Sequence, residues 1–287
     1  MHRNGVTGVA LAILFSLCFF IACGDDGDNT PVDGDSNENT WEVSLTVSVN
    51  GQDHTIDLST LDTTTFEDQD AIRLTRIIET VALDAPWNMH YNFVGNDGFS
   101  ILDNKLEGDK GGLPYYGEME HGFLYWETDD EGNTYVRIGW DDSVNFPKFM
   151  KAKGMDGGTI EVSPIADSTV IMIAGEIRTA IDVTTLATTD VEDYKHPEDG
   201  LQPMVPMTTM FEAAGITDAD AYTYRIIGND GFANGDDNLM PYENATHTCM
   251  KPDNRAIVSE EAWDTQECCW RVKDVIVLQG VANAIAE

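Results

Sequence analysis

The sequence predicts an α+β fold made of two tandem repeats of a mixed-sheet domain, each with a helix and long loops. Two observations predict it. Segments of residues 41–164 return in the same order in residues 165–287. Within each copy, apolar residues follow a two-residue period in some stretches and a helical period in others. At 287 residues, the chain has room for two domains of ordinary size beside an N-terminal leader.

Four blocks of sequence carry the repeat. Residues 57–64 return as 182–189, residues 74–79 as 207–212, residues 91–99 as 224–232, and Trp140-Asp141 as Trp263-Asp264. The offsets of 125, 133, 133 and 123 are nearly constant. Four collinear matches indicate a tandem duplication, so we expect one domain over residues 41–164 and a second over residues 165–287.

The elements expected in each copy follow from local patterns. Alternating apolar residues on both sides of Asn50-Gly51 predict a hairpin over residues 43–58. Apolar spacing predicts a helix over residues 72–81, and its counterpart around residues 207–211 ends at Gly215, a favourable residue after a helix. Further strands are predicted at residues 91–94, 159–162 and 272–278.

The N-terminus predicts a lipoprotein signal peptide over residues 1–22. A short basic region precedes an apolar run that is too short for a membrane span, which needs roughly 20 apolar residues. The run ends at Cys23 in a pattern that resembles a bacterial lipobox, so we expect lipidation of Cys23, with ordinary cleavage or an uncleaved anchor as alternatives. Residues 23–40 contain six acids and no bases, which predicts a disordered acidic tether.

The charge balance narrows the partners. The chain has 16 Lys and Arg against 51 Asp and Glu, a net charge of −35. Nucleic acids and anionic headgroups both need basic patches, so neither is an expected partner. The lipid at Cys23 is then the expected link to a membrane, which places the protein in a bacterial cell envelope, at the periplasmic face or the cell surface. Gly24 after Cys23 favours the outer membrane, by resemblance to bacterial sorting signals.

The repeated motifs resemble a known family. A helix of Leu-x-x-Ile-Ile-Glu character, a strand entering Gly-Asn-Asp-Gly-Phe and a closing Arg-Val-Lys-Asp strand are similar to the molybdopterin-binding domain of the sulfite-oxidase type. These motifs are Leu74–Glu79, Gly95–Phe99 and Arg271–Asp274, with Met207–Glu212 and Gly228–Phe232 in the second copy. The resemblance implies the same fold in both copies and a molybdopterin cofactor.

The chain departs from that family at the residues that hold the metal. Catalytic members bind molybdenum through a cysteine thiolate, but residues 41–164 contain no cysteine. The second copy has its cysteines after the Gly-Asn-Asp-Gly motif, whereas the family ligand precedes it. No cluster of Lys and Arg suited to the pterin phosphate is evident in the sequence. We therefore expect the scaffold without the activity, and no cofactor.

Three functions are consistent with these patterns. The first is a non-catalytic binding or interaction module on a lipid anchor. The second is a molybdopterin-dependent oxidoreductase, or an accessory subunit of one. The third, weaker than either, is a divalent-cation protein that uses the acidic loops.

The two Gly-Asn-Asp-Gly motifs supply the first candidate binding residues. Asn96 and Asp97 in one copy, and Asn229 and Asp230 in the other, could place a carboxylate at the mouth of a loop. The same residues are also favourable for a tight turn, because the side chains bond to the backbone and glycine accepts positive φ. We expect the turn in both copies.

A second group of candidates combines acids, histidines and cysteines. Glu118, Glu120 and His121, with His247 at a similar place in the second copy, could ligate a metal or transfer protons. Their spacing matches no known metal motif, so we predict no metal site. In an oxidising compartment, Cys249 is expected to bridge to Cys268 or Cys269, and a bond between those two neighbours is the rarer alternative.

Overall fold

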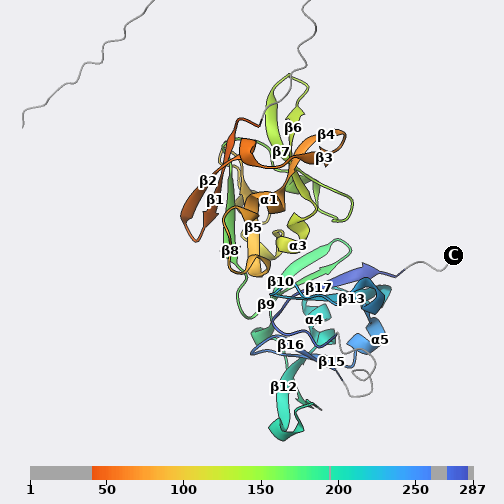
Figure 1. Cartoon of the computed structure of the whole chain (residues 1–287). Helices are drawn as coiled ribbons and strands as arrows, with labels where there is room; N and C mark the ends of the chain where they lie inside the picture. Colours follow the sequence, from red (N-terminus) through yellow and green to blue (C-terminus); the bar gives the residue numbers. More distant parts are fainter. Residues whose placement is uncertain (1–40, 194, 260–269, 284–287) are drawn as a thin grey trace, which may run out of the picture. The chain divides into compact units, whose positions relative to one another are not determined.

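The computed structural model describes residues 41–193, 195–259 and 270–283. Strands account for 42% of these residues and helical turns for 21%. The α+β fold predicted from the periodicity and from the resemblance is therefore wrong. The described part of the chain is mostly β, with four small sheets and α-helices of only one or two turns (Figure 1).

The first sheet of the N-terminal half (residues 41–164) has the strand order β2-β1-β8-β5. Its strands are β1 (Ser44–Val49), β2 (Gln52–Asp57), β5 (Met89–Val94) and β8 (Thr159–Pro164). β1 runs parallel to β8, whereas the other neighbours are antiparallel. The predicted hairpin is confirmed: Asn50 and Gly51 join β1 to β2 with φ of 52° and 79°, the left-handed conformation that this residue pair tolerates.

The second sheet of this half has the order β3-β4-β6-β7 and is antiparallel throughout. Its strands are β3 (Thr64–Phe66), β4 (Gln69–Arg73), β6 (Gly122–Thr128) and β7 (Thr134–Trp140). This sheet explains why the fold prediction failed. β6 and β7 lie in a segment predicted as loop, although their aromatic and β-branched residues flank an Asp-Asp-Glu-Gly-Asn turn typical of a hairpin.

The C-terminal half (residues 165–287) also contains two sheets, with orders β10-β9-β17-β13-β14 and β11-β12-β15-β16. The first comprises β9 (Thr169–Ala174), β10 (Ile177–Asp182), β13 (Tyr222–Gly228), β14 (Met240–Pro241) and β17 (Val275–Ala282). The second comprises β11 (Thr189–Glu192), β12 (Leu201–Pro206), β15 (Thr248–Lys251) and β16 (Ala256–Ser259). Apart from the short β14, both sheets repeat the order and direction of the N-terminal strands, including the parallel pair β9 and β17.

The helices are short. The α-helices are α1 (Leu74–Glu79), α2 (Ile101–Asn104), α3 (Tyr116–Met119), α4 (Met207–Ala213) and α5 (Tyr242–Ala245). The 3₁₀ turns are η1 (Leu58–Thr60), η2 (Pro86–Asn88), η3 (Lys110–Gly112), η4 (Lys148–Met150), η5 (Val183–Thr185), η6 (Pro197–Asp199), η7 (Ala219–Ala221) and η8 (Asp236–Asn238). Among the described residues, none of these helices has both the length and the apolar character needed to cross a membrane.

The predicted helix over residues 72–81 is shorter than expected, because its first residues belong to a strand. Ile72 and Arg73 end β4, where they pair with Leu124 and Phe123 of β6. The same apolar run therefore serves a strand and then α1. Its counterpart α4 begins at Met207 and is followed by Gly215 at φ 75°, as predicted.

Three of the four repeated sequence blocks fall on equivalent elements. Residues 57–64 and 182–189 surround η1 and η5, α1 and α4 carry the second block, and β5 and β13 carry the third. The fourth block includes Trp263-Asp264, which lies outside the described residues. This placement and the shared strand order support the proposal that the chain arose by duplication.

Each half has its own apolar core, formed by one face of each of its two sheets and by one helix. That helix is α1 in the N-terminal half and α4 in the C-terminal half. Tyr91 and Tyr224 occupy equivalent central positions with no exposed surface. Their hydroxyls donate to Pro86 O at 2.8 Å and Ala219 O at 2.7 Å, so each buried phenol is satisfied in the same way.

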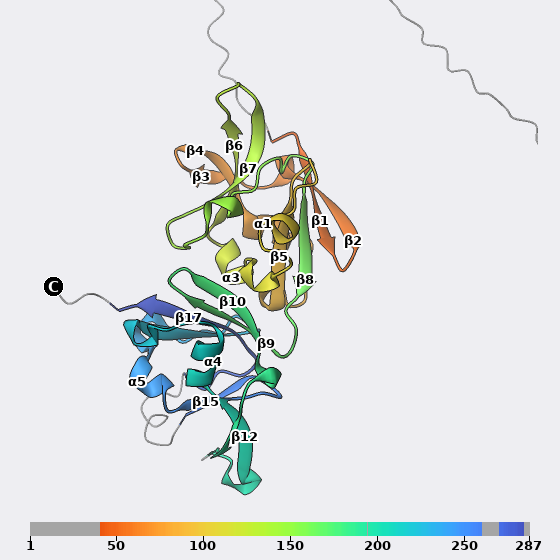
Figure 2. The same cartoon turned by 180° about the vertical axis from the view of Figure 1, so that it is seen from behind.

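The outer faces of the two first sheets differ. Ile171 and Ile173 of β9 stand at the register positions that Thr46 and Ser48 occupy in β1. The apolar face of the C-terminal sheet is covered by a third cluster, in which Tyr115 of the N-terminal half is buried. An apolar face must be covered and a polar one need not be, so this difference decides which face lies at the junction. Both views place the β9–β10 hairpin beside the N-terminal half (Figures 1 and 2).

An ion pair crosses the same junction. Arg178 of β10 donates to both carboxylate oxygens of Glu118 in α3 at 2.6 Å, and to Leu113 O at 2.8 Å. The two side chains are only 13% and 8% exposed. Beside them, Gly111 of η3 approaches the β10 backbone so closely that a Cβ would lie 2.2 Å from Ala180 N. These contacts join the halves by a paired charge and by close backbone packing.

Candidate functional site

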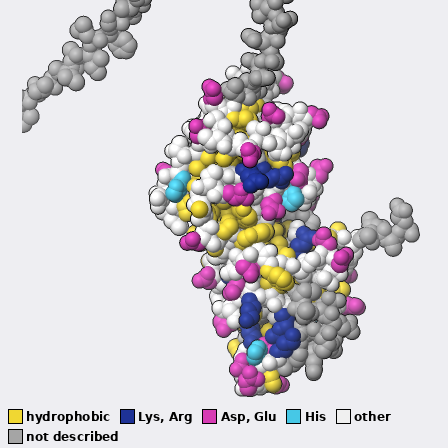
Figure 3. All heavy atoms as spheres, in the orientation of Figure 1, with side chains coloured by type: hydrophobic (Ala, Val, Ile, Leu, Met, Phe, Trp, Pro, Cys, Tyr) yellow, Lys and Arg dark blue, Asp and Glu magenta, His cyan; other side chains and the backbone are white. Residues whose placement is uncertain are grey.

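A cavity of about 360 Å³ lies beside Asp97 in the N-terminal half. We call it the cationic cleft, and its lining residues are Asp97, Phe99, Lys105, Tyr135, Arg137, Lys151, Ala152 and Lys153. Four of the 16 basic residues of the chain therefore meet in one cavity, although the net charge is −35. On the face seen in Figure 3, acidic side chains are spread over both halves, while Lys and Arg form a few separate groups.

The Gly-Asn-Asp-Gly loop forms one wall of the cleft. It leaves β5 and turns because the Asp97 carboxylate accepts a hydrogen bond of 2.9 Å from Phe99 N and Gly98 adopts φ 81°. Asn96 N donates to Gly154 O at 2.7 Å, which fixes the loop against the segment that carries the lysines. The expected turn is therefore confirmed, and it leaves Asp97 exposed at the edge of a positively charged cavity.

The opposite wall comes from the β6–β7 hairpin. Arg137 of β7 forms an ion pair with Glu127 of β6, which also accepts a 2.9 Å hydrogen bond from the Tyr135 hydroxyl. Partial burial raises the pKa of Glu127, but these hydrogen bonds outweigh it and hold the pKa below its usual value. Arg137 Nε is buried with no hydrogen-bond partner among the described residues. Glu127 therefore fixes the orientation of the guanidinium.

The lysines are placed by two aromatic rings. Lys105 Nζ lies 5.8 Å from the centre of the Phe99 ring, and Lys153 Nζ lies 5.3 Å from the centre of the Tyr135 ring. At these distances a cation is attracted by the face of the ring, which favours side-chain positions over the cavity without neutralising the charge. Lys105 and Lys153 are exposed and Lys151 is half-buried, so all three ammonium groups can meet a dissolved ion.

The lining residues of the cleft carry a net positive charge. Asp97 is the one carboxylate among them, against four cations. Glu127 lies outside the lining and is paired with Arg137. Asp129 is half-buried at the hairpin turn, where Asn133 occupies its carboxylate and lowers its pKa.

The sequence expectation of no basic cluster is wrong at this site. The cations lie between residues 105 and 153, on a loop, on a strand and on a second loop, so no short stretch of sequence is basic. The β6–β7 hairpin and the bond between Asn96 and Gly154 bring them together. The signal available in the sequence was the Lys-Ala-Lys stretch of residues 151–153, the densest group of basic residues in the first copy.

The second copy of the loop has a different environment. Asp230 caps the same turn by accepting a 3.0 Å hydrogen bond from Phe232 N, and Asn229 N donates to Asp274 O at 3.0 Å. Gly231, however, packs against Trp87 of the N-terminal half, where a Cβ would lie 2.5 Å from the indole. This loop therefore forms part of the junction.

Two cations of the C-terminal half share a buried carboxylate. Backbone bonds from Ile138 N to Ala152 O and from Ile257 N to Val272 O make Arg271 the counterpart of Lys151, and Ala256 the counterpart of Arg137. Arg271 and Lys251 both contact the carboxylate of Asp193 at 3.1 Å, and Asp193 is 1% exposed. Burial raises the pKa of Asp193, but the bonds from both cations outweigh it and lower that pKa. A carboxylate of the chain itself thus pairs with the counterpart of Lys151.

The structure separates the acid and histidine candidates. His121 Nδ1 lies 3.1 Å from Asp141 Oδ2, so its partner is Asp141 and not Glu120. Glu120 is exposed and lines a different cavity of about 370 Å³ at the junction, which Gly231 also lines. His247 is exposed after α5. Among the described residues, no group of three or more His, Cys, Asp or Glu side chains could hold a metal ion.

The cysteine predictions stay untested. Cys249 is half-buried in β15, and its expected partners Cys268 and Cys269 lie outside the described residues. The predicted lipid-bearing Cys23 also lies outside them.

The chain was compared with known proteins at three levels. No family model, no curated protein and no solved structure matches it. The site is therefore interpreted from its own geometry.

Proposed function

We propose that this protein is a lipid-anchored, extracytoplasmic binding protein of the bacterial cell envelope that holds a small anion in the cationic cleft. The observation that carries the proposal is the convergence of Lys105, Arg137, Lys151 and Lys153 on one cavity of a strongly acidic chain. The signal peptide, Cys23 and the acidic tether predicted from the sequence supply the membrane link, with the outer membrane favoured.

The electrostatics favour a ligand of concentrated negative charge. The net charge repels anions at long range, but salt screens this repulsion beyond about 8 Å. Inside the cleft the cations act at direct contact, where a hydrogen bond to a charged group contributes about 1.5–3 kcal/mol. The cleft volume of about 360 Å³ limits the ligand to a small molecule. A phosphate, sulfate or carboxylate group fits the three lysines that line the cleft.

Asp97 makes the cleft selective as well as attractive. Its exposed carboxylate can accept a hydrogen bond, so a hydroxyl or amine on the ligand would be favoured next to the anionic group. A bare polyanion would meet the repulsion of that carboxylate. We therefore expect a hydroxylated or aminated small anion to bind more tightly than an inorganic ion.

A molybdopterin oxidoreductase remains the alternative function, and the residues present do not fit its metal. The resemblance implies a cysteine thiolate as the molybdenum ligand, but the half that contains the cleft has no cysteine. The cations could hold a phosphate of such a cofactor, so the cleft alone does not separate the two functions. Molybdenum analysis of the purified protein separates them, because a stoichiometric content would overturn the binding-module proposal.

Calorimetric titration of the mature chain with inorganic phosphate and with glycerol 3-phosphate tests the proposed ligand class. We expect both to bind, the ester more tightly, with an affinity that falls as salt rises. The double variant K151Q/K153Q should lose at least ten-fold in affinity. Lys273→Gln is the matched control, because Lys273 O and Lys153 O approach the equivalent glycines of the two loops. Absence of binding, or equal affinity in the double variant, would overturn the proposal.

The anchor is tested separately. Cys23→Ala should release the protein from the membrane fraction into the soluble fraction. The affinity for phosphate should not change, because the cleft lies within residues 97–153, far from Cys23 in the sequence. Retention of the variant in the membrane would contradict lipidation at Cys23.

A further inference from the structure

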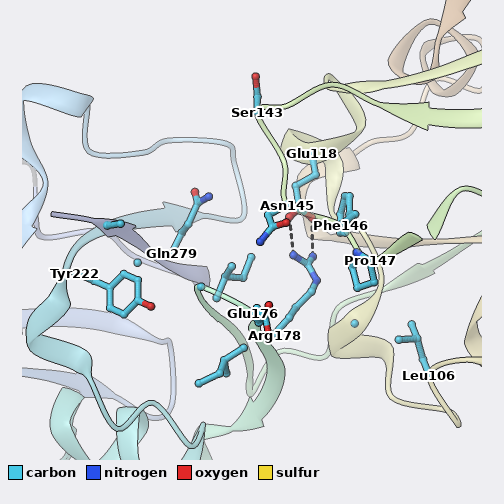
Figure 4. A pocket seen from close by; sticks show the side chains of 16 residues that line it. Leu106, Glu118, Ser143, Asn145, Phe146, Pro147, Glu176, Arg178, Tyr222 and Gln279 are labelled. Carbon is cyan, nitrogen blue, oxygen red and sulfur yellow. Dashed lines mark hydrogen bonds and ion pairs between the residues drawn. The ribbon is translucent and has the colours of Figure 1, made fainter. Parts of the chain in front are cut away.

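A second cavity, of about 680 Å³, lies between the two halves (Figure 4). The N-terminal half contributes Leu106 and the segment from Ser143 to Pro147. The C-terminal half contributes the β9–β10 hairpin, Tyr222 and the end of β17. Its volume lies within the range of about 300–1,000 Å³ that is typical of small-molecule sites, and such sites favour the boundaries between domains.

The walls of this junction cavity are held in place by contacts that do not need a ligand. The bidentate pair of Arg178 and Glu118 joins the two sides, and the Arg178 guanidinium lies 5.1 Å from the centre of the Phe146 ring. Gly280 lets the Tyr222 ring lie against β17, because a Cβ there would be 3.0 Å from the ring. The cavity is therefore preformed, which lowers the entropy cost of binding.

The one cation that lines this cavity is already paired. Arg178 and Glu118 neutralise each other and are largely buried, so neither offers a free charge to a ligand. The remaining acidic residue of the lining is Glu176, which is exposed at the turn of the β9–β10 hairpin. An anion would thus meet an acid at the rim and no unpaired cation within. The cationic cleft has the opposite charge preference, because its lysines favour an anion.

The rest of the lining combines apolar side chains with neutral polar groups. Leu106, Ile173, Ile177, Phe146 and Pro147 supply apolar surface. Figure 4 shows Asn145 beside the ion pair, with Gln279 and Tyr222 on the other side of the cavity. Amide groups offer both a donor and an acceptor, which match an amide or hydroxyl group of a ligand.

We propose that the junction cavity binds an uncharged, largely apolar small molecule that carries an amide, amine or hydroxyl hydrogen-bonding group. Such a ligand contacts both halves, so its binding also strengthens their association. The site is separate from the cationic cleft and selects ligands of a different charge.

Two probes with one scaffold test this inference. N-phenyl-1-naphthylamine is uncharged, and 8-anilino-1-naphthalenesulfonate adds a sulfonate to the same ring system. Fluorescence titration of the mature chain should show tighter binding of the uncharged probe, by about ten-fold. Binding of the uncharged probe should also raise the melting temperature of the protein, because only the folded state contains the cavity. Equal affinity for the two probes, or tighter binding of the sulfonate, would overturn the proposed charge selection.

Variants then locate the probe. Ala282→Trp and Ser143→Trp place a large ring in the cavity from opposite halves and should each weaken the uncharged probe at least ten-fold. Both residues are exposed, so neither change disturbs a core, and circular dichroism checks the fold. Thr65→Trp, at an exposed position of β3, is the control and should leave affinity unchanged. Phosphate affinity should be unaffected in all three. Unchanged probe affinity in both cavity variants would place the probe elsewhere and overturn the inference.

Discussion

The two halves of this chain share a backbone plan but not a charge distribution. Both have the same order of strands, the same parallel pair of first and last strands, and the same Asp-capped turn after the equivalent strand. In the N-terminal half that turn borders a cationic cavity, whereas in the C-terminal half its Gly231 packs against Trp87. A duplicated scaffold thus keeps its backbone hydrogen bonds while its side chains diverge in function.

The positions of the carboxylates show how the divergence works. Asp193 lies between Lys251 and Arg271 and is almost fully buried, so these two cations of the C-terminal half share a carboxylate of the chain. The N-terminal half has Glu127 against Arg137 but further lysines around an open cavity. We infer that an external anion takes the place in one half that a side chain of the protein takes in the other.

Removing the cation that joins the halves should have the largest effect. Arg178→Met leaves the buried Glu118 carboxylate without its partner, and we expect a loss of about 3–5 kcal/mol in the free energy of unfolding. Arg225→Met is the control, because its partner Asp236 is 82% exposed and such pairs contribute less than about 1 kcal/mol. Urea unfolding measures both. Equal losses in the two variants would show that the junction ion pair stabilises the protein no more than an exposed pair does.

Removing the internal carboxylate should make the C-terminal half resemble the N-terminal one. Asp193→Asn removes the negative charge that Lys251 and Arg271 share, and we expect a loss of about 3 kcal/mol in the free energy of unfolding. Added phosphate should restore part of that stability and raise the melting temperature of the variant more than that of the wild type. An equal phosphate response in the two proteins would contradict the view that Asp193 acts as a built-in ligand.

The buried histidine of the N-terminal half should give the two halves different pH dependence. Burial, with smaller contributions from Arg178 and Lys110, lowers the pKa of His90 to about 4, and its counterpart in the C-terminal half is Thr223. Because the folded state resists protonation, the unfolded state binds more protons between pH 6.5 and 4, and stability falls as pH drops through that window. The loss should reach about 3 kcal/mol.

His90→Thr tests this dependence by installing the residue of the other half. Unfolding free energies measured from pH 7 to pH 4 should fall less steeply in the variant than in the wild type, although carboxylates titrate in both. Parallel pH profiles would show that His90 contributes nothing to acid sensitivity.

The aspartates that cap the equivalent turns η1 and η5 should give the smallest effect, and an equal one in both halves. Asp57 accepts hydrogen bonds from Ser59 N at 3.0 Å and Ser59 Oγ at 2.6 Å, and Asp182 accepts the same two bonds at the same distances from Thr184. Asp57→Ala and Asp182→Ala should each cost about 1 kcal/mol. Thermal unfolding of the two variants should show equal shifts, and a clear difference would mean that the equivalent turns are not energetically equivalent.

The local turns were predictable because their chemistry lies in adjacent residues. Asn50-Gly51 and Asn96-Asp97-Gly98 contain both the side-chain acceptor and the glycine that a tight turn needs, so no distant contact has to be known. The sheets were less predictable. The β3-β4-β6-β7 sheet pairs residue 72 with residue 124, and no local pattern fixes a contact over that separation. The α+β prediction failed at this point.

The sites were less predictable still. Asp97 was a candidate from its motif, and the structure places it in the cationic cleft, but all four cations come from outside that motif. Glu118 was a candidate metal or acid/base residue, but its pairing with Arg178 could not be predicted because the two residues lie in different halves. Sequence patterns report periodicity and turns, whereas charge pairing depends on which loops the tertiary fold brings together.

The parallel pairing of first and last strands governs the order in which the chain can fold. β17 is the central strand of its sheet, between β9 and β13, and it follows all the other strands of the C-terminal half in the sequence. The N-terminal half can close as soon as β8 has been synthesised, whereas the first sheet of the C-terminal half stays open until β17 follows. A truncation before β17 would therefore remove the middle of a sheet rather than its edge, and would leave two strand pairs with open edges.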